Sequence, residues 1–379
     1  MFRAIAVEFR QIFSHLGVLV VVIGGPLFYA FLYPLPYKND IVTAQKIALV
    51  DQDHSRLSRQ LTKMLEASQE VKIASYPSSM QEAKKLLEEE KIFGIVLIPR
   101  FFERHVYTSV PAKIELYANA NYFLIYSTIG HATAKTVQAL SQKLKIYKDL
   151  YLGEHATEHN LFDLQDIPLY NPSLGYLNYA IAHVFIFILH QTLLIGAGGI
   201  TCANPRRFQG FVEALQTCLV RALCFTLIYT FHLLLYFGVL FPYYGVHIHA
   251  HPTELLLCGL VFLFAVSSFG VLMGAFASKP AHITQIVLVA SLPLVFMMGF
   301  IWPSELMPAF LRLPLQLIPA THGISALVML NQFAAPISAV LYDLCALVVL
   351  AVGSLLIGAW RMQRRDFATM RSQTKSKEV

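Results

Sequence analysis

Long stretches without Asp, Glu, Lys or Arg dominate the hydrophobic pattern of the chain. A helix needs about 20 mostly apolar residues to cross a membrane, and six stretches suffice, the last with one charged residue, Asp343, near its start: residues 16–33, 176–200, 222–241, 255–277, 282–301 and 338–360. The first lacks the small A-x-A residues of a signal-peptide cleavage site, so we interpret it as an uncleaved anchor. The pattern therefore predicts a membrane α-helical fold with six transmembrane helices in a one-plus-five layout, residues 176–360 forming the five-helix part.

A polar segment, residues 34–175, separates the first predicted span from the second. Its hydrophobic positions alternate between the strand and helix periods. Strands are expected at residues 46–51, 71–74, 92–98 and 113–117, and helices after the capping residue Ser55, at 79–91 and at 122–152. The segment is long enough to fold on its own. We therefore expect an α/β domain inserted between transmembrane helices 1 and 2.

Composition and charge fix the expected orientation. The chain is 56% hydrophobic and only 14% charged, whereas globular chains carry about 25% charged residues. Its net charge of +6 comes from short loops and not from a basic nucleic-acid face. Twelve basic residues fall on one predicted side: Arg3, Arg10, Arg206, Arg207, Arg221, Lys279, Arg361, Arg364, Arg365, Arg371, Lys375 and Lys377. Because basic loops stay in the cytoplasm, both termini, including the basic tail 361–379, are predicted to be cytoplasmic, and the α/β domain periplasmic.

Two predicted cytoplasmic segments could contact a partner protein. Residues 1–15 are expected to form an amphipathic helix, and the loop 202–217 is expected to begin a helix after Pro205. The apolar face of the first helix holds Phe2, Ile5, Ala6, Phe9, Ile12 and Phe13. Arginine side chains in both segments could equally anchor in lipid headgroups. The candidate contact residues are Phe9, Arg10, Arg206, Arg207 and Glu213.

Polar side chains inside the spans form a second candidate site. Such residues are costly in lipid and usually face a bundle interior or a water-filled path. The candidates for a translocation path are His183, His190, Gln191, His232 and Gln285. Interhelical hydrogen bonding is the alternative for all of them. Asp343 lies near the predicted outer interface, where a carboxylate needs no function.

The segment after the fifth predicted span, residues 302–337, is interrupted by proline and largely apolar. Residues 313–342 carry no charge. An apolar stretch broken in this way predicts one or two short re-entrant helices packed against protein. We expect an outward gate here, with Trp302, Pro303, Glu305, Met307 and Pro308 as its candidate residues.

Motifs for enzyme chemistry are weak in this sequence. Residues 155–159 match the H-x-x-E-H order of inverted zinc peptidases, but two histidines do not complete a zinc site, and a polar linker is the favoured interpretation. His247, His249 and His251 alternate near Glu254 and could bind a metal, although an interfacial loop explains them equally. No G-x-x-x-x-G-K-[ST] phosphate loop occurs. The chain is therefore not expected to be an enzyme or to bind a metal or cofactor itself.

Four segments together resemble a known family. They are ALVDQDHSRLSRQL (48–61), GIVLIPRFFER (94–104), LYNPSLGYLNY (169–179) and GFIWPSELMPAFLRLPLQLIPATHGI (299–324). With the one-plus-five layout, they resemble the membrane subunits of type-two ABC exporters, in the bacterial branch that has a large periplasmic domain after the first helix. The loop after the second helix departs from the ERGT cluster of many members and reads ANPRRFQGFVEAL.

The resemblance implies a permease of the bacterial inner membrane. Two such subunits, identical or paralogous, pair with two cytoplasmic ATPase subunits that bind ATP and Mg. A periplasmic adaptor and an outer-membrane channel often join them. The mostly apolar bundle favours export of hydrophobic or amphiphilic substrates, drug-like or lipid-like, as in multidrug efflux. The alternative is a membrane-tethered receptor or assembly protein; an ion-coupled transporter ranks third because Asp343 is its only candidate buried carboxylate.

Overall fold

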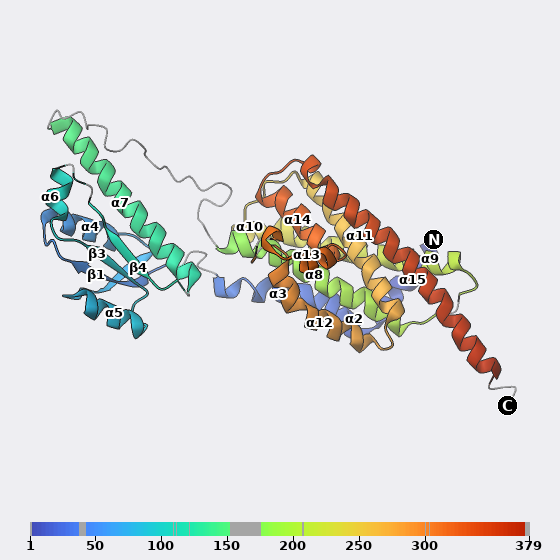
Figure 1. The fold of residues 1–379 in the computed structure, drawn as a ribbon. Helices are drawn as coiled ribbons and strands as arrows, with labels where there is room; N and C mark the ends of the chain where they lie inside the picture. The colour runs from blue at the N-terminus through green and yellow to red at the C-terminus, as the bar shows by residue number, and fades with distance from the viewer. Residues whose placement is uncertain are drawn as a thin grey trace. The chain divides into compact units, whose positions relative to one another are not determined.

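The computed structural model of the protein describes residues 2–37, 43–108, 110, 112–120, 122–151, 176–206, 208–299, 301–302 and 304–375. The chain divides into two compact units (Figure 1). One unit, here called the membrane unit, combines Met1–Lys38 with Pro168–Val379, and the other, the α/β unit, is Asn39–Ile167.

The membrane unit is built from helices alone in the part that the structure describes. Its α-helices are α1 (Phe2–Ser14), α2 (Leu16–Leu19), α3 (Gly25–Leu32), α8 (Tyr176–Ala203), α9 (Phe211–Leu235), α10 (Phe241–Tyr243), α11 (Pro252–Phe276), α12 (Pro280–Met297), α13 (Ala309–Leu315), α14 (Pro319–Gln332) and α15 (Leu341–Lys375). Among the described residues, six helical stretches are long and apolar enough to span a membrane: Leu16–Tyr37, Leu177–Ala203, Phe211–Tyr243, Pro252–Phe276, Pro280–Met297 and Ile337–Arg364. The prediction of six helices long and apolar enough to cross a membrane is therefore confirmed.

The start of the third span differs from the prediction. Residues 202–217 were expected to form a loop with its own helix, and the span was expected to begin at residue 222, but α9 runs unbroken from Phe211. The prediction placed the start of the span just after Arg221, because a charge is costly in an apolar helix. That cost is reduced here because the Arg221 guanidinium is paired with Glu8.

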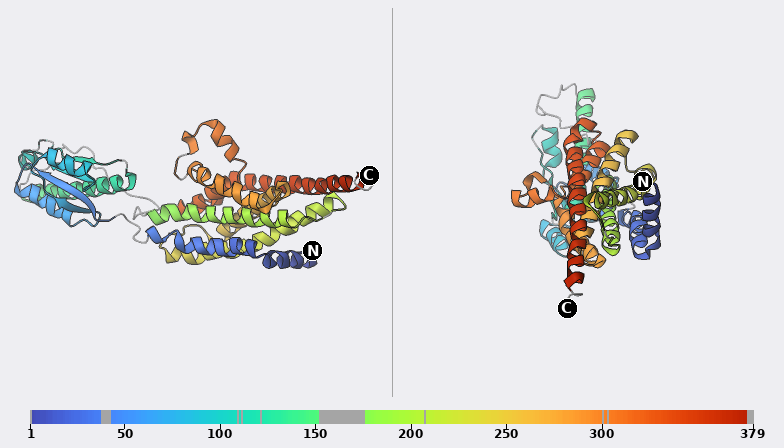
Figure 2. Two further views of the ribbon diagram at one scale, coloured as in Figure 1. Left: turned by 90° about the horizontal axis from the view of Figure 1, so that it is seen from below. Right: turned by 90° about the vertical axis from the view of Figure 1, so that its right-hand side faces the viewer.

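Helix α8 lies at the centre of the membrane unit, where long helices run side by side (Figure 2). The apolar window of its span is 83% buried, against 22% for Leu16–Tyr37 and 17% for α12. Small residues let α8 and α11 approach closely. A Cβ atom at Gly274 of α11 would overlap the carbonyl oxygen of Gly198 in α8. Gly198, near the end of this span, therefore serves close helix packing.

The α/β unit contains a four-stranded sheet in the order β2-β1-β3-β4. Strand β1 (Gln45–Asp51) is parallel to β2 (Val71–Ser75) and to β3 (Gly94–Ile98), and β4 (Glu115–Ala118) is antiparallel to β3. All four strands lie where the alternating pattern predicts them. Buried β1 residues alternate between the two faces: Ile47 and Leu49 enter one hydrophobic cluster, Ala48 and Val50 the other.

Four helices complete this unit: α4 (Arg56–Glu66), α5 (Met80–Glu88), α6 (Phe102–Tyr107) and α7 (Phe123–Tyr151). Buried residues of α4 and α7 pack on the Ile47 face and those of α5 on the Ala48 face. The predicted cap is present, because Ser55 Oγ accepts from the Ser58 N–H at 3.1 Å. The short α6 was not predicted; Asp53 Oδ2 accepts from its Glu103 N–H at 3.0 Å.

Candidate functional site

The N-terminal helix α1 packs against α9 through a face that includes a carboxylate. Ile12 is 1% exposed and Ile5 and Phe9 pack against the core of the membrane unit. Glu8 shares this face, since residues 5, 8, 9 and 12 have helical spacing, and it is 1% exposed. Ala6 and Phe13, on the rest of the predicted apolar face, are exposed in the chain alone, so a face turned towards lipid stays a prediction.

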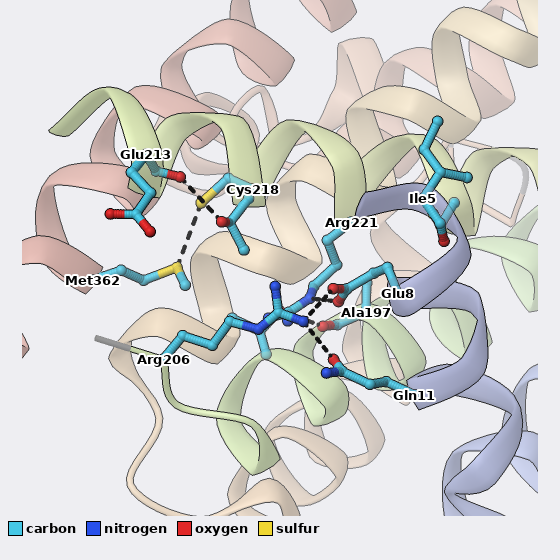
Figure 3. Close-up of polar contacts among 12 residues, drawn as sticks. Ile5, Glu8, Gln11, Ala197, Arg206, Glu213, Cys218, Arg221 and Met362 are labelled. Atoms are coloured by element: carbon cyan, nitrogen blue, oxygen red, sulfur yellow. Dashed lines mark hydrogen bonds and ion pairs between the residues drawn. The ribbon is translucent and has the colours of Figure 1, made fainter. Parts of the chain in front are cut away.

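Glu8 binds two arginines that come from elsewhere in the chain (Figure 3). Its Oε1 accepts from Arg221 Nε in α9, and its Oε2 lies 3.2 Å from Arg206 Nη2 in the loop between α8 and α9. Arg206 Nη2 also donates to Gln11 Oε1 at 3.0 Å. We call Glu8, Gln11, Arg206 and Arg221 the Glu8 cluster. It joins α1, the α8–α9 loop and α9.

The Glu8 cluster holds a buried charge that needs a partner. Arg221 is 0% exposed, and its Nη1 and Nη2 atoms have no hydrogen-bond partner among the residues described. One carboxylate faces two guanidinium groups, so the cluster carries one excess positive charge. Removing one partner of a buried ion pair typically costs about 3–5 kcal/mol, because the other charge stays buried. Glu8 is therefore required wherever Arg221 is present.

Of the residues predicted to contact an ATPase, only Arg206 belongs to the Glu8 cluster. Phe9 packs beside it on α1, whereas Arg10 is exposed. Glu213 Oε2 accepts from the Gln209 N–H at 2.7 Å and so caps the start of α9. Arg207 lies outside the described residues. The role of these residues towards an ATPase stays a prediction.

The cytoplasmic ends predicted from charge meet at one end of the bundle. Cys218 Sγ of α9 lies 3.4 Å from Met362 Sδ of α15, and the Arg361 guanidinium stands over the Phe276 ring of α11 at 5.3 Å. The Glu8 cluster lies beside Cys218 (Figure 3). Helices α1, α9 and α15 and the α8–α9 loop, which carry the basic residues, thus meet at this end.

His232, one of the predicted path residues, makes an interhelical hydrogen bond. Its Nε2 lies 3.0 Å from the Val22 carbonyl oxygen. Pro26, four residues after Val22, has no N–H to bond that carbonyl. The same relationship recurs nearby: Tyr244 Oη donates to Ala30 O at 3.0 Å, four residues before Pro34. Side chains of the α9–α10 segment thus satisfy carbonyls that prolines of the first span leave free.

The other predicted path residues do not form one constellation with His232. His183 Nδ1 lies 2.6 Å from Tyr179 O of its own helix, and Gln285 is exposed on α12. His190 is fully buried, and neither of its ring nitrogens has a partner in the described structure, nor has Gln191 Nε2. His190 shares a helix face with Leu194 and Ala197, which contact Gly270 of α11. Any role of these residues in translocation stays a prediction.

The segment after the fifth span contains two helices, as predicted. Helices α13 and α14 meet at an angle of 85°. Thr321 Oγ1 donates to Leu315 O at 2.8 Å across this bend. Of the candidate gate residues, Trp302 is 55% exposed, Met307 is 8% exposed and Pro308 precedes α13. Pro303 and the side chain of Glu305 are not among the described groups.

A histidine–aspartate pair holds the bend against α15. His322 Nδ1 lies 2.8 Å from Asp343 Oδ1, and its Nε2 lies 3.1 Å from Gln316 O. Ser325 Oγ donates to Asp343 Oδ2 at 2.9 Å. Because the Gln316 carbonyl only accepts, Nε2 must carry a proton. The Nδ1–Asp343 contact needs a second proton, so the pair is either imidazolium with carboxylate or imidazole with carboxylic acid.

Only one residue of this pair was considered in the sequence analysis. Asp343 was noted as a carboxylate without a required function, and His322 was not singled out. Nothing in the spacing of the two residues indicates the contact, because the α14–α15 connection brings them together. The Glu8–Arg221 pair was missed for a similar reason: Arg221 was counted among the cytoplasmic basic residues, and nothing in the sequence linked it to Glu8.

The histidine loop between α10 and α11 is bonded to its neighbours. The His247 N–H donates to Asn178 Oδ1 at 2.9 Å, and the rings of His247 and His249 stack at 6.0 Å. No group of three or more His, Cys, Asp or Glu side chains that could hold a metal occurs among the described residues. The H-x-x-E-H sequence, residues 155–159, lies outside them.

Comparison with known proteins gives one family. The model of a family described as ABC-2 family transporter protein matches residues 16–360. Among solved structures, a crystal structure described as a domain of a putative ABC type-2 transporter from Thermotoga maritima matches with 21% identity, covering 32% of this chain and 81% of that chain, with a TM-score of 0.25. No curated protein matches the chain.

Proposed function

The chain belongs to the ABC-2 family of transporter proteins, as the membrane component of an ABC transporter, and from this premise we propose that it exports a hydrophobic or amphiphilic substrate. ATP is hydrolysed by a separate subunit, which membership of this family implies as a partner. The substrate leaves the cytoplasm or the inner leaflet of a bacterial inner membrane. The chain works with a second permease subunit, identical or paralogous.

The Glu8 cluster is the observation that supports coupling to the ATPase. A subunit pressing on the α8–α9 loop would displace Arg206, and Arg206 is joined to α1 by hydrogen bonds to Glu8 and Gln11. Glu8 is joined in turn to α9 by Arg221. Force at one loop is therefore delivered to two helices at once. The positive-inside rule supports a cytoplasmic location for this end.

The opposite end of the bundle supports an outward gate. Asp343 and Arg361 are 18 residues apart on α15, so about 27 Å separates the His322–Asp343 pair from the end that carries the Glu8 cluster. The bend between α13 and α14 is held by Thr321 and His322. Release of these hydrogen bonds would free α13 and the residues before it. This is how the segment would open to the periplasm.

A second subunit has apolar surface to cover. The spans least buried within the chain are α12, at 17%, and Leu16–Tyr37, at 22%. Gln285 is an exposed polar residue on α12. We place the substrate path where these two spans of one subunit face those of the other, with Gln285 on the path. An adaptor and outer-membrane channel would dock on the α/β unit.

Copurification tests this proposal. Tagged chain is expressed together with the candidate ATPase subunit, purified in detergent and reconstituted into vesicles. The ATPase subunit is expected to be retained, and a fluorescent amphiphile is expected to cross the membrane only with ATP. The proposal would be contradicted if the purified chain retained no ATPase subunit and transport into the vesicles did not depend on ATP.

A further inference from the structure

Strand β4 lies at one edge of the sheet in the α/β unit, and its outer side has no partner strand in the part of the chain that the structure describes. On its inner side β4 runs antiparallel to β3, with Tyr117 opposite Ile95. The Asn119 N–H donates to Phe93 O at 3.0 Å. Because backbone groups alternate in direction along a strand, the N–H and C=O of Tyr117 face β3 and those of Leu116 face outwards. A further strand could therefore pair with β4.

A groove lies beside this edge, between β4 and α7, and has a volume of about 560 Å³. Leu116, and Ile114 just before the strand, pack on the sheet face that α7 covers, whereas Lys113, Glu115 and Tyr117 are exposed. Neighbouring strands lie about 4.8 Å apart, and residues directly opposite each other share one face of the sheet. Every second side chain of a strand added to β4 would thus enter the groove.

The groove is apolar beside β4 and polar beyond it. A Cβ at Gly130 of α7 would lie 3.9 Å from Leu116 Cδ2. Because α7 follows β4 and runs back along it, later residues of α7 lie beside Ile114 and beyond. The α7 side of the groove consists of Gly130, Thr133, Ala134, Val137, Gln138, Ser141, Gln142 and Lys145. Those from Ser141 onwards are exposed and form the rim, so the groove accepts apolar side chains next to β4 and polar ones at its far end.

The length and charge of the groove indicate its occupant. Gly130 and Lys145 are 15 residues apart on α7, about 22 Å, whereas the four residues of β4 span about 13 Å. The β4 strand of a second copy would leave the far end empty, so a longer extended segment of another protein fits better. Residues 124–147 of α7 include Lys135, Lys143 and Lys145 and no acidic residue. The far end therefore favours an acidic side chain.

We propose that β4 and this groove bind an extended segment of a partner protein, which adds a fifth strand antiparallel to β4. Antiparallel pairs are the more common and slightly the more stable. The segment then begins beside Ala118 and ends beside Lys145, with apolar residues at alternate positions and an acidic residue at its C-terminal end. Main-chain hydrogen bonds give affinity and the alternate side chains give specificity. The proposal goes beyond the export function and does not depend on it, because strand addition requires no ATP.

A synthetic peptide tests the site in the full-length protein. The peptide Val-Thr-Val-Thr-Val-Glu-Glu, with a fluorophore at its N-terminus, is titrated with the chain in nanodiscs of zwitterionic phospholipid, and fluorescence anisotropy reports binding. The peptide Val-Val-Thr-Glu-Glu-Val-Thr has the same composition but no two valines at alternate positions, and it is expected to bind at least tenfold more weakly. Equal binding of the two peptides, or no binding of the first, would overturn the proposal.

Methylation of peptide nitrogens distinguishes strand addition from other modes of binding. A residue of the peptide that points its side chain into the groove also points its N–H at β4, as Leu116 does in the opposite direction, whereas the next N–H faces away. Methylating the nitrogen of the second valine is therefore expected to weaken binding at least fivefold. Methylating that of the second threonine should change it less than twofold. Equal losses would overturn strand addition.

Two pairs of variants locate the peptide on the chain. Ala134→Trp, at an exposed position lining the groove, fills it and is expected to weaken binding at least tenfold; Ala139→Trp, exposed on the other flank of α7, is its control. Lys145→Gln is expected to weaken binding about threefold, and Lys143→Gln, exposed away from the groove, is its control. Unchanged binding in Lys145→Gln would overturn the acidic end of the segment.

Unchanged binding in Ala134→Trp would place the peptide elsewhere and overturn the whole proposal. The mass of the chain in each nanodisc is measured alongside. If Ala134→Trp separated two copies of the chain and left peptide binding unchanged, the edge of β4 would belong to a second copy and not to a partner protein.

Discussion

The carboxylate of Glu8 in the first helix binds the guanidinium of Arg221, 213 residues further along the chain, and neither side chain is more than 1% exposed. The pair fixes α1 to α9 inside the membrane unit. An amphipathic N-terminal helix could instead have rested on lipid headgroups with its charges outward. The buried contact makes α1 part of the helix bundle.

Loss of one partner of this pair is expected to destabilise the protein strongly. Glu8→Gln leaves Arg221 buried without its counter-charge, and we expect a loss of about 3–5 kcal/mol in the free energy of unfolding. Thermal unfolding in detergent measures the change. The double variant Glu8→Leu with Arg221→Met removes both charges and should recover most of the loss. A double variant as unstable as Glu8→Gln would contradict the assignment.

Arg206 separates coupling from folding. Its side chain is 35% exposed, so loss of its own ion pair should cost no more than about 1 kcal/mol, while Arg206→Glu also places a second carboxylate beside Glu8. ATP-driven transport is expected to fall at least tenfold at an unchanged amount of protein in the membrane. Arg3→Glu, an exposed change on α1 at a residue outside the candidate contacts, is the control. Equal transport by both variants would show that Arg206 is not in the coupling route.

The His322–Asp343 contact should appear as an energetic coupling. Either His322→Ala or Asp343→Ala leaves the other group buried without its partner, and each is expected to lower stability by about 3–5 kcal/mol. The double variant should lose less than the sum of the two single losses, by a coupling energy of about 1–3 kcal/mol. Thermal unfolding of the four proteins completes the cycle. Additive losses would mean that the two side chains do not interact.

Close packing of α8 on α11 predicts intolerance at one glycine. Gly274→Ala brings a methyl group against the Gly198 carbonyl, a backbone atom that cannot rotate away. We expect a loss of about 1–3 kcal/mol, as for other overpacked cores. Gly353→Ala in α15 is the matched control, because a Cβ there meets nothing within 4 Å. In detergent, the unfolding temperature should fall for Gly274→Ala and should not fall for Gly353→Ala.

The sequence predicted the elements that depend on local pattern. Long apolar stretches located all six spans, and short apolar runs bounded by polar residues located the strands, because burial of apolar area dominates both. It failed where a distant partner changes the cost of a residue. Arg221 was left out of the predicted third span only because the sequence does not show that Glu8 lies next to it. Likewise, Asp343 received no role because its partner His322 is placed by the α14–α15 connection.

ATP-dependent transport by a reconstituted complex tests the central claim most directly. The chain and its ATPase subunit are placed in vesicles, and movement of a fluorescent amphiphile is followed with ATP, without ATP, and with Arg206→Glu in place of the native chain. The account predicts transport that needs ATP and both proteins and that falls at least tenfold in the variant. Transport that proceeds without the ATPase subunit would contradict it.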